Sequence, residues 1–399
     1  MIPINEQPYT LPDGWQWVTL DSVAKIIMGQ SPRGDATTDD ASYTPLIGGA
    51  ADMGDDSPSI TRYTKKPTKL SKKDDVIICV RATLGKPIFS DGEYCLGRGV
   101  AALRPCTISK SFLRYALINF EQYLYDSANG TTFLQIASKS LKRMPFPLPP
   151  FDEQQRIVSF LDEVLAKLDE TKALAQAVVD GSELRRTAIL HKAFNGELTK
   201  LWRDEHETTL DSWKKKFLSD ALISSKQKTN DFVSSDLKYV GLENMEKNGG
   251  RISFQAADEI RSTKNIFRIG DLLYGKLRPY LNKHGVAKFD GVCSTDILVF
   301  KANEQAEIEF INYFLSLPKF IEYAVANSKG INLPRVSEKI ILRAEIFLPP
   351  LQEQKEIIRL LDDLLSREQR TKELAGKILE RVELLEKSVS TRVFHGNLK

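Results

Sequence analysis

The sequence predicts an α+β fold with a pseudo-two-fold duplication, in which two α/β heads are joined by two long helices that form an antiparallel coiled coil. Three observations support this prediction. A stretch that opens LPPFDEQQRI at Leu148 and closes FNGEL at Leu198 returns 200 residues later as LPPLQEQKEI, closing FHGNL. Each copy contains a long run of apolar residues at helical spacing. Each copy also follows a segment with strand-like patterns, and these segments differ more between the two halves.

The repeat aligns without a gap, and roughly a third of the aligned positions are identical. A repeat of this length is a duplication of half the chain and is too long for a solenoid. We therefore expect a first head at 1–147, a first helix at 148–199, a second head at 200–347 and a second helix at 348–399. The identical pairs include Pro149/Pro349, Pro150/Pro350, Glu153/Glu353, Gln154/Gln354, Leu161/Leu361, Asp162/Asp362, Thr171/Thr371, Lys172/Lys372, Phe194/Phe394 and Gly196/Gly396.

Each copy is expected to form one long helix. The Pro-Pro pair sets its start, Asp152 is a suitable N-cap, and Glu153 and Glu353 suit the positive end of the helix dipole. Gly196 and Gly396 lie where a left-handed helix end is expected. Apolar or small residues at 4-3 spacing indicate a coiled coil. They are Ile157, Leu161, Val164, Leu168, Thr171, Ala175 and Val178 in the first copy, and Ile357, Leu361, Leu364, Glu368, Thr371, Ala375, Ile378, Val382, Leu385 and Val389 in the second.

The pairing direction follows from the duplication. Two copies of one unit favour a two-fold arrangement, which makes the helices antiparallel and lets each run from one head to the other. A helix of about forty residues would separate its ends by roughly 60 Å. The alternative is two amphipathic helices in two unrelated cores, and the position-by-position match of the two stripes counts against it.

The composition is that of an ordinary soluble protein, with 399 residues, 42% hydrophobic and 27% charged. No apolar run approaches the length of a membrane span and the N-terminus is no signal peptide, so we expect a cytoplasmic protein. The cysteines, at 79, 95, 106 and 293, show no C-x-x-C spacing and indicate neither zinc nor a disulfide framework. Because the net charge is only +3, any nucleic-acid surface must be a local patch.

The two heads have related patterns. LPDGWQWVTL, from Leu11, is typical of an edge strand after a turn, and YTPLIGGA and DDVIICVRA are strand-like. In the second head LDSWKKKFL, LKYVGLENM and GDLLYGKLRPYLNKHG occupy the matching places. The heads are thus homologous, but they have diverged further than the helices. Such divergence suits two recognition modules that share one frame and recognise different things.

Basic residues gather in two clusters of the first head. One is a run from Arg62 to Lys73, and the other follows the strand Val76–Val80 as RATLGK, with Gly97-Arg98-Gly99 after it. Basic residues at a strand end, beside glycines, suit contacts to phosphates and base edges. A solvated loop is the alternative for the first run. The candidate contacts are Lys65, Lys66, Lys69, Arg81, Thr83, Lys86, Arg98, Thr131 and Gln135 in the first head, and Lys276, Arg278, Tyr280, Lys283, Asn332 and Arg335 in the second.

No catalytic constellation is complete. LPPF and LPPL resemble the [ND]-P-P-[YF] loop of adenine amino-methyltransferases, but Leu148 and Leu348 lack the oxygen that accepts a hydrogen bond from the target amine. Gly85-Lys86 lacks the flanking residues of a phosphate-binding loop, no H-E-x-x-H occurs, and the four histidines are scattered.

The chain resembles, over essentially its whole length, the specificity (S) subunits of type I restriction–modification enzymes. LPDGWQWV, PLPPFDEQQRI, FNGELTKLWR and FLPPLQEQKEI carry the resemblance, in the order head, helix, head, helix. It implies two target recognition domains, each recognising one half of a split DNA sequence. It also implies that the helices hold these domains apart and dock two methyltransferase (M) subunits, for which Leu161, Leu165, Leu361 and Leu365 are candidate contacts.

The resemblance further implies activities that belong to partners. M subunits would methylate adenine N6 with S-adenosylmethionine, and motor-nuclease (R) subunits would add restriction that uses ATP and Mg, while this chain binds no cofactor and catalyses nothing. Two alternatives stay open. One is a methyltransferase or nuclease with an unrecognised site, which purified chain with DNA and labelled cofactor would reveal. The other is a partner-binding scaffold that does not recognise DNA. The target bases do not follow from sequence, since side-chain-to-base pairing depends on geometry.

Overall fold

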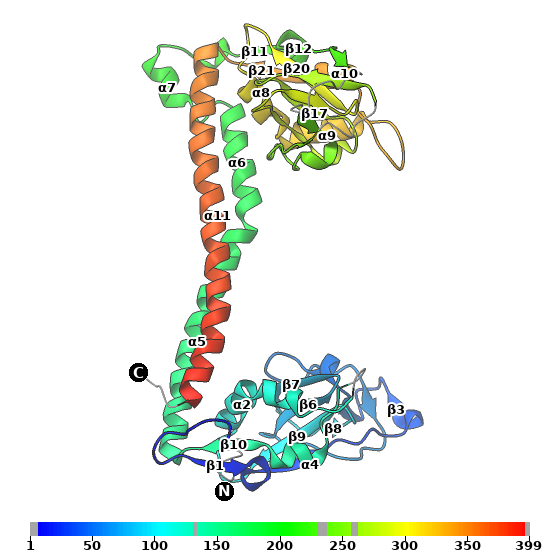
Figure 1. Cartoon of the computed structure of the whole chain (residues 1–399), viewed down its shortest axis with the longest axis vertical. Helices are drawn as coiled ribbons and strands as arrows, with labels where there is room; N and C mark the ends of the chain where they lie inside the picture. The colour runs from blue at the N-terminus through cyan, green and yellow to red at the C-terminus, as the bar shows by residue number, and fades with distance from the viewer. Residues whose placement is uncertain (1–6, 131–133, 230–237, 257–261, 396–399) are drawn as a thin grey trace. The chain divides into compact units, whose positions relative to one another are not determined.

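Each half of the duplicated sequence builds a head on a four-stranded antiparallel sheet (Figure 1). The computed structural model describes residues 7–130, 134–229, 238–256 and 262–395. The chain divides into unit 1, residues 1–175 and 377–399, and unit 2, residues 176–376. Both boundaries fall inside long helices, α5 (Phe151–Asp180) and α11 (Leu351–Phe394), so each unit contains one head and segments of these helices.

In the head of unit 1, the inner strand β6 (Val76–Arg81) of the main sheet is buried on both faces. The main sheet has the order β2 (Ala24–Met28), β9 (Val100–Pro105), β6, β7 (Thr83–Phe89), and a second sheet has the order β3 (Thr37–Thr38), β5 (Tyr63–Thr64), β4 (Thr44–Ile47), β8 (Cys95–Leu96). Alternate strand residues point to opposite faces. Val76, Ile78 and Val80 therefore pack in the main core with α2 (Lys110–Asn119), whereas Ile77 and Cys79 pack in a core with residues of the second sheet.

The head of unit 2 repeats the topology of the main sheet, while its second sheet has five strands where that of unit 1 has four. Its main sheet has the order β12 (Leu222–Ser224), β20 (Ile297–Ala302), β17 (Leu272–Gly275), β18 (His284–Val286), and its second sheet the order β13 (Lys228–Thr229), β16 (Lys264–Phe267), β19 (Gly291–Cys293), β14 (Lys238–Val240), β15 (Gln255–Ala256). β14 pairs with β19 in parallel, as β4 does with β8. The homology of the two heads predicted from sequence is therefore visible in the strand order of the main sheet and in the parallel pair of the second sheet.

A short two-stranded sheet leads into each long helix. β1 (Gln16–Thr19) pairs with β10 (Pro145–Leu148), and β11 (Lys214–Phe217) pairs with β21 (Glu345–Leu348). The edge strand predicted for LPDGWQWVTL is thus present. The other elements are α1 (Leu20–Val23), α3 (Glu121–Asp126), α4 (Ser138–Arg143), α7 (Lys200–Glu205), α8 (Ile308–Leu315), α9 (Pro318–Ala326) and α10 (Glu338–Leu342), with 3-10 turns η2 (Gly34–Ala36), η3 (Ala50–Asp52), η4 (Leu210–Ser212), η5 (Leu218–Asp220), η6 (Leu242–Asn244) and η7 (Pro279–Leu281).

The first copy of the repeat forms two helices, so the prediction of one long helix is wrong there. α5 is followed at Gly181 by α6 (Ser182–Phe194). Glycine has low helix propensity and no side chain to pack, and the second copy has Arg381 at this position within an unbroken α11. The predicted N-cap also differs: α5 begins at Phe151, so Asp152 lies inside its first turn.

The end of each copy packs on the head of the other half. In unit 2 the ring centroid of Phe194 lies 4.9 Å from that of Phe310, and in unit 1 that of Phe394 lies 5.5 Å from that of Phe112. The left-handed helix end predicted at Gly196 is confirmed by its φ of +82°, whereas Gly396 lies outside the described residues.

The apolar stripe of the helices is interrupted. Ile157 and Leu161 are 0% exposed, as are their counterparts in the second copy, but Thr171, Thr371, Ile378 and Leu385 are exposed. The buried pairs pack in the cores of the heads in their own units. Leu161 and Leu361 therefore hold the helix against its head and offer no surface to a partner, which corrects the expected role of these two leucines. Leu165 and Leu365 are half-buried.

A buried glutamine joins each head to the start of its helix. Gln154 Oε1 accepts from Ser109 N at 3.1 Å, and its Nε2 donates to Pro149 O at 3.1 Å. Gln354 does the same, accepting from Glu307 N at 2.8 Å and donating to Pro349 O at 2.7 Å. About two helical turns after each glutamine, Asp162 and Asp362 accept hydrogen bonds from the hydroxyls of Tyr115 and Tyr313. The residues identical between the copies therefore secure the head-to-helix joint.

We predict that Gln154→Ala lowers the free energy of unfolding of the whole chain by about 1–3 kcal/mol, because it leaves a buried amide N–H and a buried carbonyl without partners. Urea denaturation measures this loss. The neighbouring Gln155 is exposed and provides the matched control, since Gln155→Ala should change stability by less than about 0.5 kcal/mol. Equal effects of the two substitutions would contradict the proposed joint.

Candidate nucleic-acid interface

In unit 2 the candidate residues lie on two loops that are joined through their backbones. After β17 the chain enters the segment 276–283, in which Arg278 and Asn282 have left-handed φ values of +53° and +45°. Arg278 N donates to Pro334 O at 2.7 Å, and Val336 N donates to Lys276 O at 3.0 Å. The loop after α9 therefore pairs with the end of the strand, which brings the candidates at 276–283 and those at 332–335 next to each other.

Unit 1 contains the same joint. Ala82 N donates to Leu134 O at 2.8 Å, Ile136 N donates to Val80 O at 3.0 Å, and Ala82 has a φ of +62°. Ala82 is thus the counterpart of Arg278, and Arg81 and Arg278 do not occupy equivalent positions. The sequence stretch RATLGK is also not a loop: β6 and β7 form a tight hairpin, which places Thr83 and Lys86 on a strand.

Most candidate side chains are accessible. Arg81, Lys276 and Lys283 are half-buried, and Thr131 lies outside the described residues. The exposed candidates are Lys65, Lys66, Lys69, Thr83, Lys86, Arg98, Gln135, Arg278, Tyr280, Asn332 and Arg335.

Backbone hydrogen bonds bring several head 1 candidates together. Leu96 N donates to Lys69 O at 2.8 Å, and Val80 N donates to Gly99 O at 2.8 Å. The Lys69 and Arg98 segments are therefore neighbours of the strand end that carries Arg81, which in turn bridges to Gln135. Lys65 and Lys66 follow β5 in the second sheet instead.

Some of the candidate cations already have protein partners. The ammonium of Lys86 donates to Met53 O at 2.9 Å, and that of Lys283 donates to Leu242 O at 2.7 Å. Lys86 thus bonds to the residue after η3, and Lys283 bonds to the first residue of η6. Arg335 Nε lies 3.4 Å from Asp296 Oδ1. Arg278 and Tyr280 are the exposed side chains of the strand-end loop, with Tyr280 53% exposed.

A buried histidine anchors the strand-end loop 276–283 to the rest of the second head. His284 is 0% exposed, and its Nδ1 lies 2.7 Å from Asn312 Oδ1. Asn282 Nδ2 lies 3.2 Å from His284 Nε2 and donates to Leu315 O at 2.9 Å. Burial, with a smaller contribution from Arg186, lowers the pKa of His284 to about 4. A neutral imidazole that donates from Nδ1 and accepts at Nε2 fits these partners and ties the loop to α8.

Comparison with known protein families assigns the fold. The model of the type I restriction modification DNA specificity domain matches twice, over residues 12–178 and 223–380. These matches cover more than half of the chain. The chain belongs to this family. Each match includes one head and the first part of the helix that follows it, so the specificity domain is the unit that was duplicated.

Curated relatives of the chain are specificity subunits of type I restriction enzymes. The chain is 27% identical to the type I restriction enzyme EcoDI specificity subunit of Escherichia coli over 337 residues, which is 77% of this chain and 74% of that protein. It is 25% identical to the EcoKI specificity subunit of Escherichia coli strain K12, covering 97% of this chain and 90% of that one. The resemblance to S subunits noted in the sequence is therefore confirmed.

Solved structures show the same fold. The HsdS subunit from Thermoanaerobacter tengcongensis matches with a TM-score of 0.65 at 18% identity and covers 99% of this chain and all of that one. A chain from a structure of a type I R-M system, described for its complex assembly and conformational transition, matches with a TM-score of 0.72 at 18% identity, covering 98% of this chain. Across the residues that the structure describes, no helix is long and apolar enough to span a membrane.

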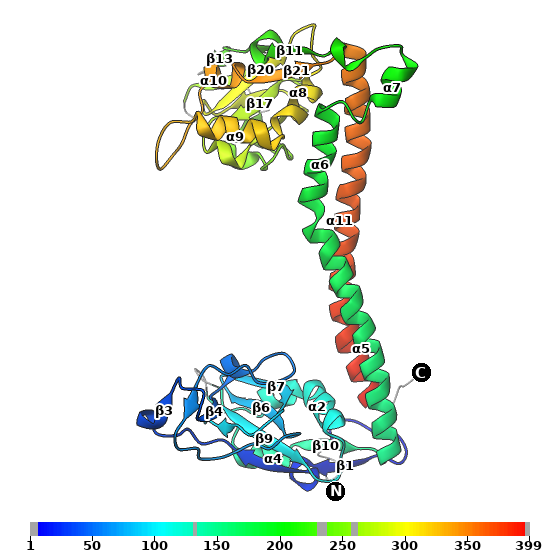
Figure 2. The ribbon, with the colours of Figure 1, turned by 180° about the vertical axis from the view of Figure 1, so that it is seen from behind.

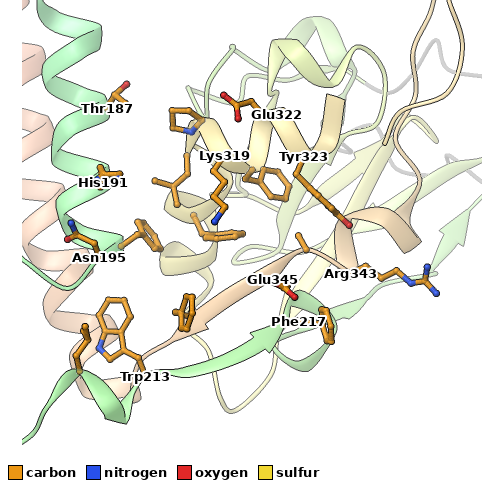
Figure 3. Close-up of a pocket in the computed structure, with 18 of the residues that line it drawn as sticks. Thr187, His191, Asn195, Trp213, Phe217, Lys319, Glu322, Tyr323, Arg343 and Glu345 are labelled. Atoms are coloured by element: carbon orange, nitrogen blue, oxygen red, sulfur yellow. The ribbon is translucent and has the colours of Figure 1, made fainter. Parts of the chain in front are cut away.

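A cavity of about 1110 Å³ in unit 2 lies away from these loops, between α6, α9, β11 and β21 (Figure 3). Its lining includes Asn195 of α6's end, Trp213 and Tyr323. In unit 1 the counterpart of Asn195 is His395, whose ring stacks on that of Tyr9 at 3.8 Å between centroids. In unit 1 the segment that contains Tyr9 therefore covers the helix end, whereas in unit 2 the cavity at the corresponding helix end is open.

Sequence reasoning missed the supporting residues of the interface. It noted only that the four histidines are scattered, and of these His284 is buried while His191, His206 and His395 are exposed. It gave no role to His284 in the loop that carries Arg278. The available signal was Asn282, because asparagine tolerates the left-handed conformation that a tight polar loop requires.

We predict that stability falls between pH 6.5 and 4 because of His284. Above pH 6.5 the imidazole is neutral in both states; as the pH falls, the unfolded chain binds a proton that the folded chain resists, and below about pH 4 the effect levels off. The total loss should be roughly 3 kcal/mol. Urea denaturation across this range should show a shallower pH dependence in His284→Gln. His206→Gln is the exposed control, and a wild-type slope in His284→Gln would refute the assignment.

Proposed function

We propose that this chain recognises a bipartite DNA sequence within a type I restriction–modification complex, with one half-site per head. The supporting observation is the duplicated joint between a strand end and a second loop, which carries different side chains in the two heads. Arg81 and Gln135 are on it in unit 1, and Arg278 and Arg335 in unit 2. Recognition of two different half-sites requires a common frame with different base-contacting groups.

We further propose that the long helices form the antiparallel coiled coil of a pseudo-two-fold arrangement and set the gap between half-sites. In support, Phe194 and Phe394 each pack on the head of the other half. In unit 2, α6 and α11 lie side by side in both views (Figures 1 and 2), and Arg185 pairs with Glu368 at 2.9 Å. That pair lowers the pKa of the Glu368 carboxyl, chiefly through the hydrogen bond from Arg185.

The helices also offer a repeated surface for two methyltransferase subunits. Leu174 and Leu374 are 65% and 54% exposed, and Leu184 and Leu384 are 75% and 69% exposed. These leucines occur in pairs 200 residues apart, so a two-fold pair of partners would meet the same residues twice. We propose them as docking contacts together with the half-buried Leu165 and Leu365, in place of Leu161 and Leu361.

The chemistry of the complex is proposed to belong to its partners, in the cytoplasm. The M subunits would use S-adenosylmethionine to methylate adenine N6, and R subunits would use ATP and Mg for restriction. This chain would bind no cofactor and would act by placing the DNA. In the described residues no group of three or more His, Cys, Asp and Glu side chains is arranged to hold a metal ion.

We predict that the heads act independently on their half-sites. In the complex with its partner subunits, Arg278→Ala should weaken or relax one half-site and Arg81→Ala the other, at a cost of about 1–3 kcal/mol for a lost base contact. Sequencing of methylated sites in host DNA gives the specificity of each half. Arg268→Ala is a control, because Arg268 is 61% exposed just before β17, at the end opposite Lys276. Equal relaxation of both half-sites by Arg278→Ala would contradict the two-head assignment.

We predict that lengthening both helices lengthens the gap. A heptad inserted after Ala175 and another after Ala375 keep the stripes in phase and add about 10 Å, or about three base pairs of DNA. The methylated sites should then keep the same bases in each half while the gap grows. An unchanged gap with intact activity would show that partner subunits, and not the helices, set the spacing.

A further inference from the structure

The loop after α9 carries apolar residues at its tip. Ile331 is 99% exposed and Leu333 is 45% exposed. In both views this loop projects from the body of the second head (Figures 1 and 2). Single exposed apolar residues are common on protein surfaces, but two on one projecting tip single out this tip as a candidate contact surface.

The tip is held in place by its own base. Lys329 N donates to Arg335 O at 2.9 Å, and Arg335 N donates to Lys329 O at 2.8 Å. Gly330 has a φ of +104°, a conformation that favours glycine. Pro334 restricts the backbone of the residue before it. Residues 330–333 therefore form a preformed projection, which loses little conformational entropy on binding.

Three cations lie near the base of the apolar tip. Lys329 and Arg335 flank it in the chain, and Arg278 is joined to the loop by the hydrogen bond from its backbone N to Pro334 O. All three side chains are exposed, and Arg335 retains its neighbour Asp296. An apolar projection with cations at its base matches a polyanion that offers apolar surface between its charges, which is the arrangement of bases and phosphates in a DNA groove.

We propose that Ile331, supported by Leu333, contacts the bases of the second half-site directly, beside Arg278 and Arg335, while Lys329 contacts a flanking phosphate. This inference rests on the proposed function and adds to it a specificity-determining residue. Ile331 would enter a groove and pack on base edges or on the faces of an opened step. Its contribution would come from water exclusion, and it would depend on the bases that it meets.

The first head has the same loop frame with another tip sequence. Gly130 has the φ of +104° that Gly330 has, and Asn129 bridges to Gln135 as Lys329 does to Arg335. The tip residues differ in sequence, with Thr131 where the second head has Ile331. A tip that changes while its frame is kept suits a base-contacting role that differs between the half-sites.

The test uses the complex of the full chain with its methyltransferase subunits, and duplexes that contain or lack the half-sites found by sequencing methylated DNA. Ile331→Ala should weaken binding to the cognate duplex by roughly tenfold or more, because the burial of one such side chain is lost. Binding to the non-cognate duplex should stay unchanged. The dependence of affinity on salt should also keep its slope, since no charge is lost, whereas Lys329→Ala should flatten it.

Two further variants sharpen the result. Ile269→Ala is the matched control, because Ile269 is 67% exposed in the same head but precedes β17, at the end opposite Lys276; it should bind like the wild type. Ile331→Lys places a cation at the tip, and it should raise binding to both duplexes while reducing discrimination between them.

The outcomes separate the two proposals. Wild-type affinity in Ile331→Ala, an equal loss on both duplexes, or full discrimination in Ile331→Lys would overturn the role of Ile331 while leaving the proposed function intact. A wild-type complex that fails to distinguish the two duplexes would overturn the proposed function itself, and this inference with it.

Discussion

The joint between each head and the start of its long helix is the contact on which the rest of the structure depends. A buried glutamine, Gln154 or Gln354, satisfies backbone groups from the head and from the Pro-Pro turn, and a tyrosine from the head donates to an aspartate on the helix. Because such groups are costly to bury unpaired, the helix can leave the head in one direction only. The joints are therefore closely bonded, whereas the apolar stripe further along the helices is interrupted.

The joined loops proposed for DNA recognition combine a shared backbone arrangement with side chains that differ between the heads. The frame is made of backbone hydrogen bonds, from Ala82 N to Leu134 O in one head and from Arg278 N to Pro334 O in the other. Backbone bonds do not depend on side chains, so residues on the joined loops can change without refolding the head. The left-handed position illustrates this: it holds an alanine in one head and an arginine in the other. Side chains on these loops can therefore diverge with little loss of folding stability, which agrees with the low similarity of the heads.

The sequence predicted much of this fold because the repeat, the Pro-Pro starts and the apolar strands are local patterns. It did not predict the break at Gly181, since a single glycine in a helical pattern is usually tolerated. It placed Thr83 and Lys86 on a loop because a tight hairpin with Ala82 at positive φ lacks the usual turn residues. The burial of Leu161 against the head could not be told from a coiled-coil position, because both give the same helical spacing. The side chains that support the interface, such as His284, depend on long-range contacts that no local pattern records.

Identity between the copies does not imply identical roles, and the two carboxylates after the Pro-Pro pairs show why. Glu153 is partly exposed and pairs with Arg156 on its own helix. Glu353 is 0% exposed and accepts from Arg203 Nη1 at 2.6 Å, Thr199 Oγ1 at 2.7 Å and Trp213 Nε1 at 2.9 Å. These donors lie in the segment that leads from α6 into the second head, a connection that exists once in the chain. In unit 1 the matching helix end is held instead by Tyr9, whose hydroxyl donates to Phe394 O at 3.0 Å. Two equivalent helix ends are thus secured by different chemistry, and the carboxylate that is identical in the two copies is buried in only one of them.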